Sequence, residues 1–339
     1  MNWIYKQVYR TLLVNLFFIA ELRKKYGQDW EDLGELYLEG RCKSTIMQYN
    51  GAYKKWKRFL EDQGRRYWTT EEVLVCKYLK ELEARGLGEG VVNQYFAMMT
   101  LMEELKGASA VSKNPVISQV RKAIIKRMNM KKNRRVRLTM TRKHMRILVK
   151  RLYYKKDVSL TERRILTMVG CMFYCLKRFS DVSRWKVENI RELPDGSFEI
   201  VQVSSKTDQE GRGMLIRIPS GKKGKVGPAE LLRTYLRSMG NSESGFVFCA
   251  MRASKKGLVP MWSKAVRYDT VRRQMKEMCR DNGLPELDVH SARIGGATES
   301  ARMGASRQQI KIVGNWRSAA VDGYIRPDEP MRGILDLLL

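Results

Sequence analysis

The residues best suited to catalysis lie close together near the end of this 339-residue sequence. His290 and Arg293 are three positions apart, so a helix would place them side by side on one face. Trp316 and Tyr324 follow further along the chain. An imidazole, a guanidinium, an indole N–H and a phenol, with no cluster of carboxylates among them, suit an anionic substrate that is handled without a metal ion.

The segments around these residues indicate how they are held. Gly295 and Gly296 come shortly after Arg293, and glycine within a helix usually marks the close approach of another backbone. A short apolar segment then ends at Gly314, two residues before Trp316. We therefore expect the helix that contains Gly295 and Gly296 to pack tightly against a neighbouring backbone.

Taken in order, these positions resemble the catalytic boxes of the tyrosine recombinase family, which shares its chemistry with type IB topoisomerases. The family pattern is H-x-x-R, a glycine followed by histidine or tryptophan, and a tyrosine shortly afterwards. The positions that match it here are His290, Arg293, Gly314, Trp316 and Tyr324. The segment H-S-A-R-I-G-G-A-T is similar to recombinases of eukaryotic mobile elements, of the DIRS and crypton kinds, and of some phages. The ordered set is specific, whereas any single piece of it is not.

The resemblance implies a further arginine upstream. Arg178 and Asp181 match the family's first box, in which an arginine follows a buried helix and an acidic residue comes three positions later. Taken alone, Arg178 could equally be a salt-bridged structural residue, and its neighbours Lys177 and Arg184 complicate the assignment. Asp181 would hold Arg178 or His290 in orientation.

The family's catalytic lysine lies on a β-hairpin, and Lys206 is the match at the exit of a predicted strand. Three further lysines in a nearby glycine-rich turn are alternatives: Lys222, Lys223 and Lys225. The chain departs from many relatives at Trp316, where they have histidine, and from many bacterial relatives at Ile294, where they also have histidine. With Trp316 the site would lack one titratable group, and we do not expect Ile294 to damage the mechanism.

These residue types fit the cleavage of a phosphodiester. The guanidinium forks of Arg178 and Arg293 can neutralise the charge that gathers on phosphorus in the transition state. A tyrosine phenol has a pKa near 10 and needs assistance, for which His290 is the candidate. Lys206 could protonate the departing 5′ oxygen, and the Trp316 indole could donate to a phosphate oxygen. The phosphotyrosine ester would conserve the bond energy, so we expect neither a metal ion nor a cofactor.

A mainly α-helical fold with a small antiparallel β-sheet is predicted to hold these residues. Four or five helices are expected in the first 130 residues, and the aromatic stripe from Tyr49 to Phe59 should be core. A helix at 161–176 is apolar on most sides and should lie in a second core. Alternation at 198–204 and 214–219 predicts a hairpin. The remaining helices are expected at 141–152, where Thr141 is the N-cap and His144 is a surface or DNA-facing residue, and at 228–239 and 262–279.

The resemblance implies a division of the chain into four parts. These are a helical core-binding domain (1–130), a basic linker (131–140), a catalytic domain (141–326) and a tail (327–339). The two domains would form a C-shaped clamp around DNA. The tail would either dock on a neighbouring protomer or fold back on its own domain.

The charge of the chain points to a nucleic acid partner. Lys and Arg number 65 against 36 Asp and Glu, a formal net charge of +29, and each neutralised phosphate adds salt-sensitive affinity. RNA and anionic membranes are the alternatives on charge alone. The residues expected on double-stranded DNA are Lys54, Lys57, Arg58, Lys131, Lys132, Arg134, Arg135 and Arg137. The last five form a basic run that could also serve as a nuclear import signal.

The six cysteines are scattered without C-x-x-C pairs, and with only two histidines a zinc site is poorly supported. We expect reduced, mostly buried thiols in an intracellular protein. The apolar run from Thr11 to Ala20 is too short to cross a bilayer and is interpreted as a core helix, so no membrane partner is expected.

The leading hypothesis is a site-specific recombinase or integrase, encoded by a mobile element, that works as a homo-oligomer, a tetramer on two DNA sites. The alternatives are a relaxing enzyme of the type IB topoisomerase kind, a non-catalytic DNA-binding protein derived from a recombinase, and an unrelated RNA-binding scaffold. In a eukaryotic host the protein would act in the nucleus, and otherwise in the cytoplasm.

Overall fold

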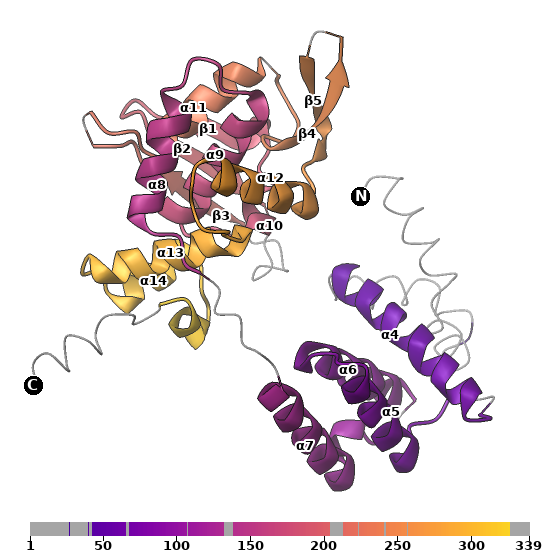
Figure 1. The fold of residues 1–339 in the computed structure, drawn as a ribbon. Helices are drawn as coiled ribbons and strands as arrows, with labels where there is room; N and C mark the ends of the chain where they lie inside the picture. The colour runs from indigo at the N-terminus through magenta and orange to yellow at the C-terminus, as the bar shows by residue number, and fades with distance from the viewer. Residues whose placement is uncertain are drawn as a thin grey trace, which may run out of the picture. The chain divides into compact units, whose positions relative to one another are not determined.

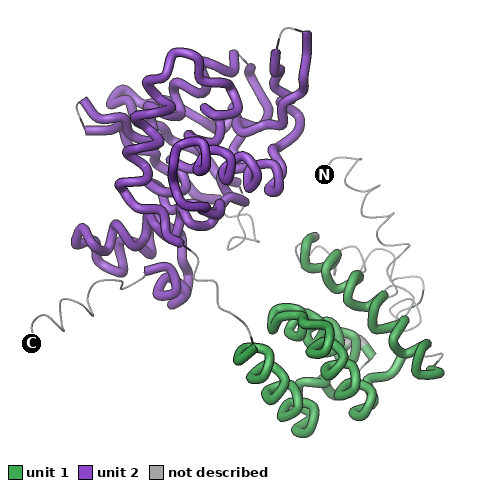
Figure 2. Tube along the Cα trace, in the orientation of Figure 1, with its two compact units in different colours: residues 1–135 green, residues 136–339 purple. Residues whose placement is uncertain are grey.

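The chain divides into two compact units, the N-terminal unit (residues 1–135) and the C-terminal unit (residues 136–339), which Figure 2 colours separately. The computed structural model describes residues 27, 40, 43–65, 68–106, 108–131, 138–203, 213–222, 224–240, 242–255 and 257–325. The apolar run at 11–20, most of the basic linker and the tail at 327–339 lie outside the described residues. The predicted clamp and tail docking therefore stay predictions.

The N-terminal unit is built from helices (Figure 1). They are α4 (Lys43–Asp62), α5 (Glu72–Ala84), α6 (Glu89–Leu105), the short η2 (Val111–Lys113) and α7 (Pro115–Lys131). Trp56 is fully buried, with its ring centroid 5.1 Å from that of Tyr78 and 5.2 Å from that of Phe59. The aromatic stripe is thus core, as predicted, because its helical spacing turns every ring to one side of α4.

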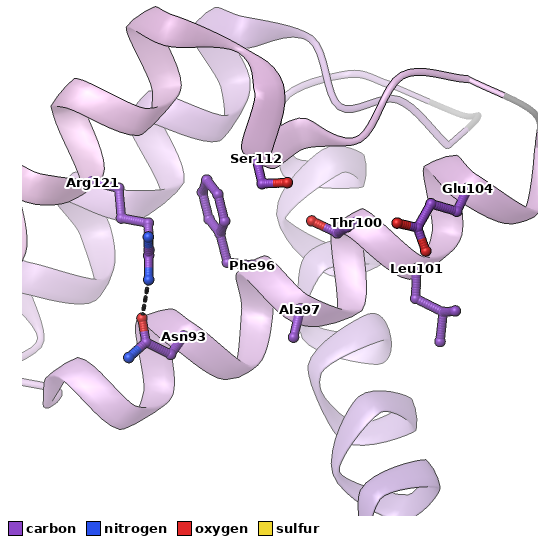
Figure 3. A pocket seen from close by; sticks show the side chains of 8 residues that line it. All are labelled: Asn93, Phe96, Ala97, Thr100, Leu101, Glu104, Ser112 and Arg121. Atoms are coloured by element: carbon purple, nitrogen blue, oxygen red, sulfur yellow. Dashed lines mark hydrogen bonds between the residues drawn. The ribbon is translucent and has the colours of Figure 1, made fainter. Parts of the chain in front are cut away.

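A cavity of about 400 Å³ lies between α6, η2 and α7, and Figure 3 shows the side chains around it. Arg121 in α7 donates from Nη2 to Oδ1 of Asn93 at 2.6 Å, and its guanidinium lies 4.8 Å from the centroid of the Phe96 ring. Both contacts reach across to α6. This arginine therefore ties two helices together.

The C-terminal unit begins with α8 (Arg142–Leu148), which continues as a π-helical turn, η3 (Val149–Tyr153). Thr141 caps α8 by accepting from the backbone N–H of His144, and the His144 Nδ1 accepts from the Thr141 N–H in return. Burial lowers the pKa of His144, and nearby Lys143 lowers it further. The imidazole therefore serves as a neutral helix cap at a half-buried position, a local role that the prediction of a surface or DNA-facing residue did not include.

The helix α9 (Leu160–Tyr174) lies in the core of this unit, packed against α11 (Pro228–Met239), α12 (Tyr268–Asp281) and α13 (Val289–Arg302). Residues 164 to 173 of α9 are all buried, which confirms the prediction made from its apolar composition. After α9 the chain forms the single-turn helix α10 (Phe179–Val182). After α13 it forms α14 (Arg307–Gly314) and the short η5 (Ala319–Gly323).

Two antiparallel sheets are found in the described residues. One joins β1 (Ile190–Glu192), β2 (Phe198–Gln202) and β3 (Met214–Ile218), in which Ile200 pairs with Ile216 in the core. The other is a hairpin of β4 (Cys249–Ser254) and β5 (Gly257–Ala265). The helix predicted from Trp262 was therefore wrong at its start, because α12 begins only at Tyr268. Most of β5 is exposed or half-buried, so it lacks the alternation that identifies a strand.

The two adjacent glycines of α13 allow it to pack tightly, as predicted. A Cβ added at Gly295 would lie 1.8 Å from the carbonyl oxygen of Met140, and one at Gly296 would lie 2.0 Å from that of Phe173. Both obstacles are backbone atoms, which cannot move aside as a flexible side chain can. The backbone of α13 consequently lies against the end of α9, and this brings two distant parts of the sequence together.

Gly296→Ala should destabilise the C-terminal unit by about 1–3 kcal/mol, the usual cost of overpacking a core. Calorimetry on the full chain can measure this as a lower melting temperature of that unit. Gly51→Ala in α4 is the matched control, since a Cβ there meets nothing within 4 Å and alanine favours a helix. Equal effects of the two substitutions would contradict the close packing of α13 on α9.

Candidate active site

Arg178 and Arg293 are far apart in the sequence of the C-terminal unit, and both lie close to one carboxylate, that of Asp181. Arg178 precedes α10 and Arg293 lies in α13. The Nη1 of Arg178 is 3.7 Å from Oδ2 of Asp181, and the Nη1 of Arg293 is 4.0 Å from the same oxygen. Asp181 also accepts a hydrogen bond from the Arg178 backbone N–H at 3.2 Å. The buried carboxylate therefore holds both guanidiniums and offsets part of their repulsion.

Arg293 is deeply buried, with 1% of its surface exposed. Burial lowers its pKa to about 9, and the neighbouring Arg178 adds to this shift, while Tyr324 and Asp181 oppose it. With a pKa of about 9 the guanidinium is charged at neutral pH. A further negative charge in the site would nonetheless stabilise the charged guanidinium. Burial has removed its hydration, and it shares the carboxylate of Asp181 with Arg178.

The aromatic residues of the motif surround Arg293. Its guanidinium carbon lies 4.0 Å from the centroid of the Trp316 ring and 5.2 Å from that of Tyr324. The Tyr324 ring meets the Trp316 ring edge-on, with centroids 4.9 Å apart, and the His290 ring at 5.2 Å. The structure thus brings five predicted residues into one site: Arg178, His290, Arg293, Trp316 and Tyr324.

Several buried donors at this site have no hydrogen-bond partner among the described residues. They are Nη1 of Arg178, Nε and Nη1 of Arg293, and Nε1 of Trp316, and the Oδ1 of Asp181 is the one unpartnered acceptor beside them. An unsatisfied buried N–H costs about 1–3 kcal/mol, so such a group of donors is unfavourable unless a ligand uses it. Donors outnumber acceptors here, and an anion with several oxygen atoms matches that excess.

A cavity of about 200 Å³ opens beside these groups. His290 and Arg293 line it from α13, and Lys177 and Phe179 line it from the segment around Arg178. Tyr268 closes another side, where its hydroxyl donates to Oδ1 of Asp288 at 3.2 Å. The volume is suited to one phosphate group rather than to a large organic ligand.

The other predicted residues are placed less completely. Lys206 lies in the loop between β2 and β3, outside the described residues, and so do Lys132, Arg134, Arg135 and Arg137. Lys54, Lys57 and Arg58 are exposed on α4, on the face opposite the buried rings, and Lys131 ends α7 with an ion pair to Glu83 at 3.4 Å. Their roles in binding DNA stay predictions.

The burial of two cations, Arg164 and Lys177, was not predicted from the sequence. Arg164 is 1% exposed within α9 and donates to the Cys249 carbonyl and to Oε1 of Gln274, so it joins α9 to β4 and α12. Lys177 is 5% exposed and donates to the Val313 carbonyl at 2.8 Å. No local pattern distinguishes either residue, because Arg164 follows Glu162 and Arg163 and Lys177 precedes Arg178. Such a charge is buried only when the packed elements supply its acceptors.

The described cysteines are free thiols, and Cys171, Cys175, Cys249 and Cys279 are buried while Cys76 is half-buried. The described residues contain no group of three His, Cys, Asp or Glu side chains that could hold a metal ion. None of the helices in the described ranges has the length and hydropathy that crossing a bilayer requires.

Comparison with known proteins agrees with this geometry. No protein-family model matches the chain. The recombinase Cre of Escherichia phage P1 is 23% identical over 297 residues, which cover 84% of this chain and 84% of Cre.

Solved structures share the fold at low sequence identity. The Tn1549 transposon integrase in complex with transposon right end DNA has a TM-score of 0.58 at 12% identity, covering 94% of this chain and 97% of that one. A lambda integrase dimer bound to a COC′ core site has a TM-score of 0.57 at 14% identity, covering 88% and 95%. The chain is thus a homologue of the recombinase Cre and has the fold of the tyrosine recombinases, as its ordered motifs predicted.

Proposed function

We propose that this chain is a site-specific DNA recombinase of the integrase kind, which cleaves and rejoins strands through a 3′-phosphotyrosine at Tyr324. One observation carries the proposal above all others. Unpartnered donors of Arg178, Arg293 and Trp316 gather around Arg293, which lines a phosphate-sized cavity together with His290, and the Tyr324 ring contacts the rings of Trp316 and His290. This arrangement suits a bound phosphodiester and a phenol that attacks it.

The reaction would proceed by a direct exchange of esters. The phenol oxygen of Tyr324 forms a bond to phosphorus, the bond from phosphorus to the 5′ oxygen breaks, and the phenol proton passes to His290. The two arginines bind the non-bridging oxygens and become better satisfied as charge grows on them. The 5′ oxygen takes a proton from Lys206, in the role that the resemblance implies. Reversal with a different 5′ end rejoins the strand.

Incubation with a nicked duplex that carries the recognition site tests this proposal, because a short strand released at the nick prevents rejoining and traps the intermediate. We expect a protein–DNA adduct that survives denaturation, with its mass increment on the peptide that contains Tyr324. Binding of the duplex without any adduct would remove the enzymatic proposal. It would favour a DNA-binding protein derived from a recombinase.

The DNA-bound relatives and the net charge of +29 support double-stranded DNA as the partner. We further propose a homotetramer on two DNA sites, since exchange between two duplexes requires four cleaved strands. The mass of the complex in solution tests this, and a single protomer that relaxes supercoiled DNA would instead indicate a topoisomerase-like enzyme. A mobile element as the source, and the nucleus as the place of action in a eukaryotic host, belong to the same proposal.

A further inference from the structure

Lys177 is a buried ammonium group beside the candidate active site. It sits between the end of α9 and Arg178, it is 5% exposed, and it lines the same cavity as His290 and Arg293. Burial lowers its pKa, while Asp181 acts in the opposite direction. A lysine in such a place is unfavourable unless a specific acceptor holds it. Its acceptor is the main-chain carbonyl of Val313, at 2.8 Å.

The carbonyl of Val313 belongs to the last turn of α14, where helix geometry leaves the final four carbonyls without partners. The chain itself satisfies two of them, since the N–H of Asn315 donates to Ile312 and the N–H of Trp316 donates to Lys311. Asn315 has the left-handed conformation, with φ of +54°, that makes this capping possible.

Two cations from other elements satisfy the remaining two carbonyls. Lys177 Nζ donates to Val313, and Arg293 Nη2 donates to Gly314 at 2.9 Å. Both cations also lie at the negative end of the helix dipole, which favours them further. The end of α14 is therefore held from two sides, by α13 and by the segment that carries Arg178.

The end of α14, which Lys177 and Arg293 hold, is followed by Trp316 and then by Tyr324. Trp316 folds back over Gly314, where an added Cβ would lie 1.7 Å from the indole ring, and it contacts both Arg293 and Tyr324. A shift of the Val313 carbonyl would move Gly314, then Trp316, and with it the surface on which the Tyr324 ring rests. Misplacing a reacting group by about 1 Å can cost on the order of 100-fold in rate.

We propose that Lys177 is a positioning residue for the nucleophile: by holding the Val313 carbonyl it sets the turn at 314–316 and thereby the place of Tyr324 beside Arg293. This inference rests on the proposed function, since it assigns Tyr324 as the nucleophile. It gives a lysine other than Lys206 a part in the reaction, exerted through the Val313 carbonyl.

The test is single-turnover cleavage of the nicked duplex by the full chain at saturating DNA, for Lys177→Met against Lys155→Met. The control removes an equal charge at the opposite end of α9, where Lys155 is exposed and pairs with Glu162 at 3.5 Å. We expect Lys177→Met to form the Tyr324 adduct roughly 10- to 100-fold more slowly, with the affinity for the duplex close to wild type and the melting temperature modestly lower because the Val313 carbonyl loses its donor. We expect Lys155→Met to match wild type.

An external nucleophile separates positioning from a direct action on the phosphate. In a Tyr324→Phe background, hydrogen peroxide can attack the bound phosphodiester in place of the phenol, and Lys177→Met should slow that cleavage far less than it slows adduct formation. A parallel loss of peroxide cleavage would overturn the inference, and so would wild-type adduct formation by Lys177→Met. If Lys177→Met does not fold, Lys177→Gln undergoes the same two assays, because it keeps a neutral donor too short for the Val313 carbonyl. Absence of an adduct in the wild-type chain would instead remove the proposed function itself.

Discussion

Tyr324→Phe should abolish the covalent adduct with a nicked duplex while the variant still binds that duplex. Phenylalanine keeps the ring that contacts His290, Trp316 and Arg293 and removes only the oxygen that would bond to phosphorus. Because charge contacts with phosphates dominate the affinity for DNA, the dissociation constant should change by less than about twofold. Denaturing electrophoresis measures the adduct, and a filter or mobility assay measures the affinity.

Tyr268→Phe is the control for this experiment, since its phenol lines the same cavity but is bonded to Asp288. It should still yield the adduct. An adduct that persists in Tyr324→Phe and disappears in Tyr268→Phe would mean that Tyr268, and not Tyr324, is the nucleophile. This result would overturn the proposed mechanism.

The position of Tyr324 also indicates whether it acts in the active site of its own protomer or in that of another. Its ring rests on Arg293 and Trp316 of its own chain, which supports cleavage within one protomer. Mixing Tyr324→Phe with an active-site arginine variant should then give no adduct above the separate variants. Restored adduct formation in the mixture would show that one protomer lends its tyrosine to another.

The site could be predicted from the sequence only in part, and the reasons are physical. The three-residue spacing of His290 and Arg293 was enough to place them on one helix face, and α13 confirms it. The paired glycines predicted a tight helix contact, and the carbonyl oxygens of Met140 and Phe173 are the atoms they approach. Both are local properties of one element, which a single sequence records directly.

The meeting of Arg178 with Arg293 is not such a property. No spacing indicates that the two guanidiniums share the Asp181 carboxylate; the resemblance to a family suggested the pair, and the packing of α13 on α9 brings them together. Asp181 was expected to orient Arg178 or His290; the contact with Arg178 is present, and the structure adds one with Arg293.

Elements whose stability depends on tertiary partners were the ones missed. The β4–β5 hairpin has little buried surface and therefore little periodicity, so its second strand was predicted as the start of a helix. Lys177 was considered only as a neighbour that obscured Arg178. Its burial depends on the end of α14, far away in sequence, and no pattern around residue 177 contains that information.

Arg178→Ala should lower the single-turnover cleavage rate by about 10²- to 10³-fold at saturating DNA, the usual loss when one preorganised donor to the transition state is removed. That loss corresponds to about 3–4 kcal/mol of transition-state stabilisation. The Arg178 side chain is 18% exposed, and its Nη1 forms an ion pair with Asp181 at 3.7 Å but makes no hydrogen bond, so truncation removes a donor without breaking a core contact. Asp181 would keep Arg293 as a partner.

Arg184→Ala is the matched control, because it removes the same charge from an exposed position six residues further on. It should cleave at the wild-type rate once the DNA is saturating. A methylphosphonate at the scissile position sharpens the test, since it lacks one negative non-bridging oxygen. If Arg178 acts by neutralising that charge, Arg178→Ala should lose far less activity on the neutral linkage than on the natural one. An equal loss on both linkages would mean that Arg178 supports the fold of the site rather than the charge of the transition state.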